Sequence, residues 1–122
     1  MFDTTRAFSG FSVNDVEAAA KFYGQTLQIP FTEENGMLTL HLGPDKNILV
    51  YPKGDDHVPA EYTMLNFDVD DIESAVAELT SRGITFETYE GVDDRGIFRL
   101  VGPPIAWFKD PAGNVLSVIQ NS

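Results

Sequence analysis

The sequence contains an internal repeat, which constrains the fold more than any other feature. Residues 8–20 (FSGFSVNDVEAAA) and residues 64–76 (MLNFDVDDIESAV) share a pattern that returns after 56 positions. The matching positions are Phe11 with Phe67, Val13 with Val69, Asp15 with Asp71, Glu17 with Glu73, and Ala19 with Ala75. A fixed spacing of this kind indicates a duplicated structural unit, and two copies are too few for a solenoid. The sequence therefore predicts a tandem repeat.

Each copy predicts a strand that passes directly into a helix. Asn14 and Asp70 are the expected helix N-caps, and Glu17 and Glu73 follow them at capping-box spacing. The first helix has an apolar stripe at helical spacing, formed by Val16, Ala19, Ala20, Tyr23 and Leu27. The second stripe consists of Ile72, Ala75, Val76 and Leu79. We expect Gly24 to weaken the last turn of the first helix and Arg82-Gly83 to end the second.

Short strands are predicted on both sides of these helices. The first half has candidates at residues 6–13, 31–33, 37–42 and 47–51, and the second half at 62–69, 84–89, 98–109 and 115–120. Asn35-Gly36 is a strong hairpin signal between two of them. In the strand at 37–42, Leu38, Leu40 and Leu42 share one face, which leaves Met37, Thr39 and His41 on the other. Each half therefore has the order βαβββ.

The length of 122 residues fits one domain with a substantial core. We expect a single domain over residues 1–122, with module one at 5–52, a linker rich in proline, glycine and aspartate at 53–60, and module two at 61–121. The absence of cysteine excludes disulfides and thiolate sites. No apolar run is long enough to span a membrane, and the N-terminus does not resemble a signal peptide, so we expect a soluble, cytoplasmic protein.

The net charge of −11 makes nucleic acid and anionic membranes poor partners, because both repel an acidic surface. Two interpretations remain for this charge. It serves solubility, which is the more general role of net charge, or it attracts a cationic ligand.

Three motifs identify a family. They are FSVND at residues 11–15, leading to Phe22-Tyr23; FDVDD at residues 67–71; and FKDPAGNVL at residues 108–116. In this order and at this duplicated spacing, they resemble the vicinal oxygen chelate superfamily, which includes glyoxalase I, bleomycin-resistance proteins and extradiol dioxygenases. The resemblance covers nearly the whole chain. One departure is Leu27-Gln28, where the family usually has Leu-Gly, and it affects a turn.

The resemblance implies an α+β fold in which two tandem βαβββ modules form an open, cupped mixed sheet. Helices then lie on the convex side, and a small-molecule cavity lies on the concave side. In catalytic members, four strand positions hold a divalent metal through His and Glu side chains. The corresponding positions here are Phe8, Val50, Met64 and Ser117. These side chains offer one neutral hydroxyl and one soft thioether, so we predict no metal and no cofactor.

Two histidines remain as candidates for chemistry. His41 lies on the predicted concave face and is a weak catalytic candidate, as a general base or a ligand contact. The alternative is a half-exposed polar residue on a sheet. His57 lies in the acidic linker and is expected to be a solvated residue.

Further candidates on the concave face are Arg6, Ser12, Tyr62, Asn66, Asp68 and Trp107. We predict ligand binding by Phe8, His41, Met64, Asn66, Asp68, Trp107 and Ser117, because pockets combine aromatic and apolar walls with a few polar groups. Asp68 beside Trp107 suits a cationic, planar ligand. The alternative is that these residues pack in a core or a dimer interface. The DPAGN segment (residues 110–114) and the Asp70-Asp71 pair are interpreted as turn and cap.

Three functional hypotheses follow. The first is a metal-free small-molecule-binding protein similar to the bleomycin-resistance branch, which holds a cationic or aromatic ligand in the concave groove as a homodimer. The second is a lyase, isomerase or dioxygenase of the glyoxalase type, which depends on metal through ligands placed elsewhere or uses His41 or Asp68 as base. The third is a domain that acts only through protein contacts. Whether the protein is an enzyme is left open by the sequence.

Overall fold

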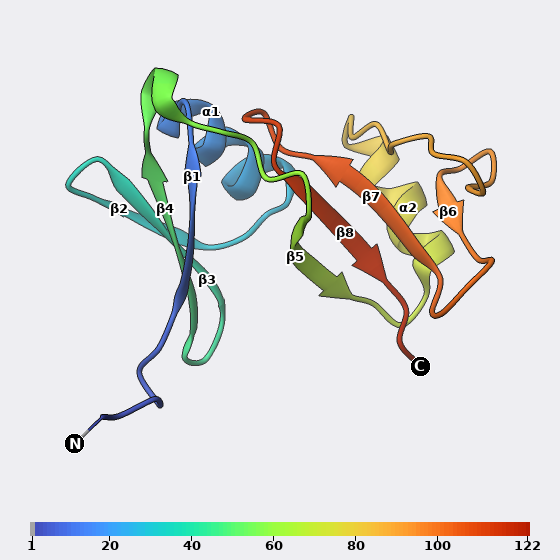
Figure 1. Cartoon of the computed structure of the whole chain (residues 1–122), viewed down its shortest axis with the longest axis horizontal. Helices are drawn as coiled ribbons and strands as arrows, with labels where there is room; N and C mark the ends of the chain where they lie inside the picture. Colours follow the sequence, from blue (N-terminus) through green and yellow to red (C-terminus); the bar gives the residue numbers. More distant parts are fainter. Residues whose placement is uncertain (1) are drawn as a thin grey trace. The chain divides into compact units, whose positions relative to one another are not determined.

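The computed structural model describes residues 2–122, which divide into two compact units. The first unit ends at Val58 and the second comprises Pro59–Ser122. The boundary falls inside the predicted linker at residues 53–60. Both units have the same strand topology (Figure 1).

Unit one is a four-stranded mixed sheet with a helix. Its strands are β1 (Ser9–Val13), β2 (Phe31–Glu34), β3 (Met37–Gly43) and β4 (Lys46–Pro52), in the order β1-β4-β3-β2. β1 runs parallel to β4, and the other pairs are antiparallel. The helix α1 (Val16–Ala20) continues as a π-helical segment at Lys21–Thr26, and a 3₁₀ turn at Gly54–Asp56 follows β4.

Unit two repeats this topology. Its strands are β5 (Thr63–Asp68), β6 (Ile97–Phe98), β7 (Ile105–Lys109) and β8 (Val115–Ile119), in the order β5-β8-β7-β6, with the helix α2 at Ile72–Ser81. The predicted α+β class and the βαβββ order of each half are confirmed. In the part of the chain that is described, no helix has both the length and the apolar character needed to cross a bilayer.

The prediction of a strand at residues 84–89 is wrong. This segment joins β7 through one backbone bond, from Glu87 N to Trp107 O at 2.8 Å, and forms no ladder. Ile84 and Phe86 are nevertheless buried, so their alternation reflects packing and not strand pairing. The short strand β6 pairs with β7 at the edge of the sheet instead. Bends in the chain separate the two strands in the sequence, so the strand predicted at residues 98–109 is interrupted.

Both helix caps lie one residue later than predicted. Asp15 and Asp71, not Asn14 and Asp70, have the extended backbone of an N-cap, and each accepts two backbone N–H bonds from the first turn. The Ser74 hydroxyl and backbone N–H groups of the first turn donate to the Asp71 carboxylate and lower its pKa. Asp15 and Asp71 are the matching positions of the repeat, so the duplication includes the cap itself.

The first helix ends in an irregular turn. Leu27 N bonds to Phe22 O at 2.9 Å, which closes the wider ring of a π-helix. Gly24 leaves room for the Phe31 ring in this turn, because a side-chain carbon there would overlap the ring. Gln28 follows with φ 60°, a left-handed conformation that glycine adopts more easily. The departure from Leu-Gly at Leu27-Gln28 therefore places a strained residue in the turn.

Each sheet has one buried face. In unit one, Leu38 is paired with Val50 and Leu40 with Ile48, and Leu38, Leu40 and Val50 are fully buried. In unit two, the buried face carries Ala106, Phe108, Leu116 and Val118. Burying one such leucine, valine or phenylalanine stabilises the fold by about 1.5–3 kcal/mol. Leu42 departs from the predicted leucine face: it is 36% exposed, because the ladder is irregular between His41 and Gly43.

The predicted turns are confirmed. Asn35 and Gly36 both have positive φ, at 55° and 76°, as a type I′ hairpin turn requires. In the turn before β8, the Asp110 carboxylate accepts the backbone N–H groups of Ala112 and Asn114 at 2.9 Å. Asp110 is buried within these bonds, so its role is structural.

Candidate functional site

Three of the predicted site residues meet on the face of the second sheet that points away from α2. Ser117 on β8 is paired with Asn66 on β5 and with Trp107 on β7, so the three side chains form one row across the sheet. The Ser117 hydroxyl donates to Asn66 Oδ1 at 2.5 Å. Ser117 is fully buried beneath its neighbours, whereas Asn66 is exposed and Trp107 is half-buried. The row therefore offers an amide and an indole surface to a ligand.

Trp107 is held in place on several sides. Its indole N–H donates to the Thr63 hydroxyl at 3.1 Å. Tyr89 contacts it in an edge-on arrangement with ring centres 5.7 Å apart, and Phe98 contacts it at 6.0 Å. Thr63, Tyr89 and Phe98 were not among the predicted site residues. Only the aromatic character of Tyr89 and Phe98 could have indicated them, since they approach Trp107 through tertiary folding.

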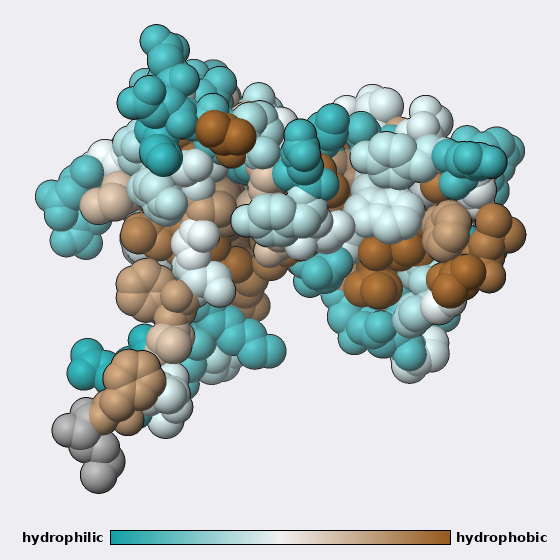
Figure 2. All heavy atoms as spheres, viewed as in Figure 1, coloured by the Kyte–Doolittle hydropathy of each residue, from teal (hydrophilic) through white to brown (hydrophobic). Residues whose placement is uncertain are grey.

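Exposed apolar and aromatic side chains lie on the β6 side of this row. Figure 2 shows hydrophobic surface over the region of β6 and the start of β7. Tyr89, Leu100 and Val101 are 48%, 72% and 77% exposed, although their side chains are large and apolar or aromatic. Exposed apolar groups around a fixed tryptophan are typical of a contact surface for a ligand or a partner.

Asp68 does not lie in the same row of the sheet as Trp107, beside which the sequence predicted it. Asp68 is paired with Ile119, one step along the same face, and its carboxylate accepts the backbone N–H of Asn121 at 3.2 Å. Asp68 is exposed and stays available to a cation, but it is not the neighbour of Trp107 that the sequence suggested. Met64 lies at an irregularity of the β5–β8 ladder and is half-buried.

The predicted ligand-binding residues of unit one lie just before β1 and on β3. Phe8 precedes β1 and is 68% exposed. His41 lies on β3, where its Nδ1 donates to Asn47 Oδ1 at 2.9 Å, since an amide oxygen only accepts. Its Nε2 lies 3.1 Å from the Thr32 hydroxyl, which donates to it when the ring is neutral. Both ring nitrogens of His41 are therefore engaged across the strands β2, β3 and β4.

The assignment of Val50 to one of the family's metal positions is wrong by one residue of strand register. Val50 is buried on the helix side of its sheet, opposite Leu38. The position that corresponds to Ser117 is Leu49, which is paired with Gly10 on one side and Thr39 on the other. Strand alternation explains the error, because a shift of one residue moves a side chain to the opposite face.

His57 is not the solvated residue expected from the linker. Its Nδ1 lies 2.7 Å from Ser12 Oγ, and the ring is half-buried. This hydrogen bond joins the segment after the 3₁₀ turn to β1 across 45 residues of sequence. Nothing in the local sequence of the linker indicates such a partner.

The side chains at the family's metal positions do not suit a divalent ion. Phe8 and Leu49 have no donor atom, Met64 has a soft thioether, and the Ser117 hydroxyl is already bonded to Asn66. Among residues 2–122, no three His, Cys, Asp or Glu side chains lie close enough together to hold a metal. The donor set therefore disagrees with the metal chemistry of the catalytic relatives, and a protein without metal stays our prediction.

A family profile described as the glyoxalase/bleomycin resistance protein/dioxygenase superfamily matches residues 7–118. The chain belongs to this superfamily. The matched residues include all the strands of both units and both capped helices, apart from the last residue of β8. No protein with a curated description matches the sequence.

Solved structures of this superfamily are similar to the chain over almost their whole length. A glyoxalase family protein from Enterococcus faecalis is 25% identical, with a TM-score of 0.69 over 93% of this chain and 94% of that one. A superfamily member from Sphaerobacter thermophilus is 24% identical, with a TM-score of 0.68 over 93% and 96%. TnmS3, an antibiotic binding protein from Streptomyces sp. CB03234, is 22% identical, with a TM-score of 0.68 over 95% and 96%. At such identities, the last two likenesses show the superfamily fold alone.

Proposed function

We propose that this superfamily member is a metal-free protein that binds a planar, aromatic small molecule against the face of the second sheet that carries Trp107. The observation that carries the proposal is the fixed indole. Thr63, Tyr89 and Phe98 hold Trp107 in one orientation, so little side-chain entropy is lost when a flat ligand stacks on it.

The surroundings of Trp107 support a ligand that is also cationic. The net charge of −11 attracts cations over the whole surface, and the Asp68 carboxylate is exposed on the same face. The side-chain NH₂ of Asn66 supplies donors, and the bond from Ser117 to its oxygen fixes the orientation of the amide. One relative by fold is described as an antibiotic binding protein, a function that this surface suits. By resemblance to the family, we expect a homodimer, which light scattering coupled to gel filtration tests. The cytoplasmic location expected from the sequence stays a prediction.

Trp107 is the only tryptophan, so its fluorescence reports this site alone. Titration with planar cationic aromatic compounds should quench the emission and raise the melting temperature by mass action. Calorimetry should then show affinity reduced by about tenfold or more in Trp107→Ala, because one stacking contact contributes on the order of 1–3 kcal/mol. Phe2→Ala, which removes an aromatic ring that is 89% exposed, is the matched control for non-specific adhesion. Binding that Trp107→Ala leaves unchanged would overturn the proposal.

The enzymatic alternative has less support from the residues described. His41 acts as a base only if Nε2 gives up its bond with Thr32, and the family's metal positions lack suitable donors. Elemental analysis of protein purified without chelators distinguishes the two functions. Stoichiometric nickel, iron, manganese or zinc would contradict the metal-free proposal.

A further inference from the structure

A hollow lies on the opposite side of the second sheet, against α2. It is a pocket of about 650 Å³ between α2 and the irregular segment that follows it. Its floor is apolar and consists of Val76, Ile84 and Phe86, all of them buried. Phe86 packs edge-on against Phe108, which belongs to the helix side of β7, so the pocket is separated from Trp107 by the sheet. The volume falls in the range typical of small-molecule sites.

The rim of this pocket is polar. Thr80 on α2 and Thr85 and Thr88 on the irregular segment line it with hydroxyl-bearing side chains. Arg95 supplies the positive charge of the lining, beside Asp94. An apolar floor with hydroxyls and one guanidinium fits a ligand that has an apolar body and an anionic end.

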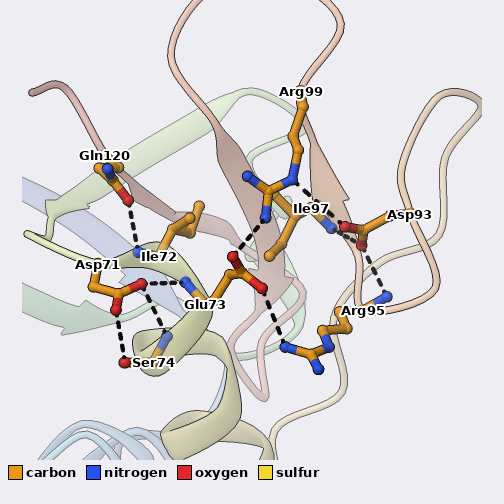
Figure 3. Close-up of polar contacts among 9 residues, drawn as sticks. All are labelled: Asp71, Ile72, Glu73, Ser74, Asp93, Arg95, Ile97, Arg99 and Gln120. Atoms are coloured by element: carbon orange, nitrogen blue, oxygen red, sulfur yellow. Dashed lines mark hydrogen bonds and ion pairs between the residues drawn. The ribbon is translucent and has the colours of Figure 1, made fainter.

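Arg95 is presented by an ordered turn. The Asp93 carboxylate accepts the backbone N–H groups of Arg95 and Ile97, each at 2.9 Å (Figure 3). Gly96 is buried with φ 91°, and a side-chain carbon there would collide with Phe86. The turn therefore lies close against the pocket floor, and this brings Arg95 to the rim.

The ion pair between Arg95 and Glu73 is weak. Its Nη1 lies 3.4 Å from Glu73 Oε1, and both side chains are 58% exposed. Glu73 also faces Arg99 at 3.5 Å, so one carboxylate is shared by two guanidinium groups (Figure 3). Exposed pairs at such distances contribute little stability. A ligand carboxylate can therefore replace Glu73 at Arg95, while Glu73 keeps Arg99.

From this arrangement we propose that the pocket between α2 and residues 84–96 binds a small amphipathic monocarboxylate. The carboxylate pairs with Arg95, the hydroxyls of the rim complete its hydrogen bonds, and the apolar body covers Ile84 and Phe86. A single negative charge is specified because Asp94 stands beside Arg95 and repels a second one. This site is independent of the ligand proposed for Trp107.

The test is a titration of the isotope-labelled protein with 3-phenylpropionate, followed by amide NMR. Shifts should be confined to α2 and residues 84–96, and the Trp107 indole signal should stay in place. The neutral analogue 3-phenylpropanol should bind about tenfold more weakly, since it lacks the charge-assisted bond. Shifts centred on Trp107 would overturn the proposal without affecting the function proposed for the other face.

Matched variants separate a specific site from general electrostatics. Arg95→Gln should weaken binding by about tenfold, whereas Arg99→Gln, which removes a charge from the same Glu73 cluster but lies outside the pocket lining, should change it less than about twofold. Glu73→Gln should strengthen binding, because it removes the competitor for Arg95. Glu78→Gln removes the same charge from the same helix, but Glu78 pairs with Arg82 and not with Arg95, so this variant should not strengthen binding. The proposal would be overturned if Arg95→Gln and Arg99→Gln changed the affinity for 3-phenylpropionate equally, or if the two glutamate variants did.

Discussion

The Ser117 hydroxyl donates to Asn66 Oδ1 at 2.5 Å, across 51 residues of sequence. The corresponding pair in unit one is Leu49 and Gly10, which cannot form this bond. The duplicated modules therefore differ at the centre of the face that we propose as the binding surface. Unit two has a polar, hydrogen-bonded pair where unit one has a leucine and a glycine.

The bond between Ser117 and Asn66 should be measurable in a double-mutant cycle. Ser117→Ala and Asn66→Ala should each lower the free energy of unfolding, and the coupling between them should be about 0.5–1.5 kcal/mol, as for an ordinary intramolecular hydrogen bond. Urea unfolding of the four proteins gives the value. Additive losses would show that the two side chains do not interact in solution.

The contact of Gly24 with Phe31 predicts a specific suppressor. Gly24→Ala should destabilise the protein by about 1–3 kcal/mol, because the added methyl group overlaps the Phe31 ring. Combining it with Phe31→Leu should recover part of this loss, since the smaller side chain leaves room for the methyl group. Thermal unfolding of both single variants and the double variant tests the expectation. If the double variant shows the sum of the two single losses, the overlap is not the cause.

Gln28 should be a site where glycine stabilises the fold. Its φ of 60° strains a residue with a side chain, and Gln28→Gly relieves that strain. The larger entropy of an unfolded chain with glycine opposes the gain, so we expect a net increase of at most about 1 kcal/mol in the free energy of unfolding. Gln25→Gly, in the π-helical segment, should instead destabilise. Equal effects at both positions would contradict this explanation.

Asp93 should make stability depend on pH in the acid range. The backbone N–H groups of Ile97 and Arg95 donate to its carboxylate, and Arg99 faces it, so its pKa is lowered. The stabilisation is complete above the ordinary pKa of an aspartate, about 4, and is lost as the pH falls through the lower pKa of the folded state. Asp93→Asn should therefore be less stable than the parent protein at pH 7, with a difference that shrinks in acid.

The control for this prediction is Asp94→Asn. It removes the same charge from the neighbouring position, and the carboxylate of Asp94 accepts none of the bonds that hold the turn. It should cost less stability than Asp93→Asn at pH 7, because it breaks neither of these bonds. Chemical unfolding at several pH values between about 2.5 and 7 makes the comparison, and parallel curves for both variants would show that Asp93 has no special role.

Much of the fold could be predicted because its signals are local. The alternation of Leu38 and Leu40 identified a buried face, and the Asn35-Gly36 pair identified a hairpin. The caps were misplaced by one residue because two polar residues precede each helix, and only the backbone conformation shows that Asp15 and Asp71 are the ones that bond to it. Residues 84–89 could not be told from a strand, because a segment with alternating buried residues and no partner strand has the same pattern in the sequence as a paired strand.

The repeat, the apolar faces and the family motifs were determined by the sequence alone, because they depend on spacing along the chain. The tertiary structure decided which side chains meet. It placed Val50 on the buried face, joined His57 to Ser12, and surrounded Trp107 with Tyr89, Phe98 and Thr63. Strand register and loop packing set these contacts between residues far apart in sequence, and a shift of one residue in register exchanges the two faces of a strand.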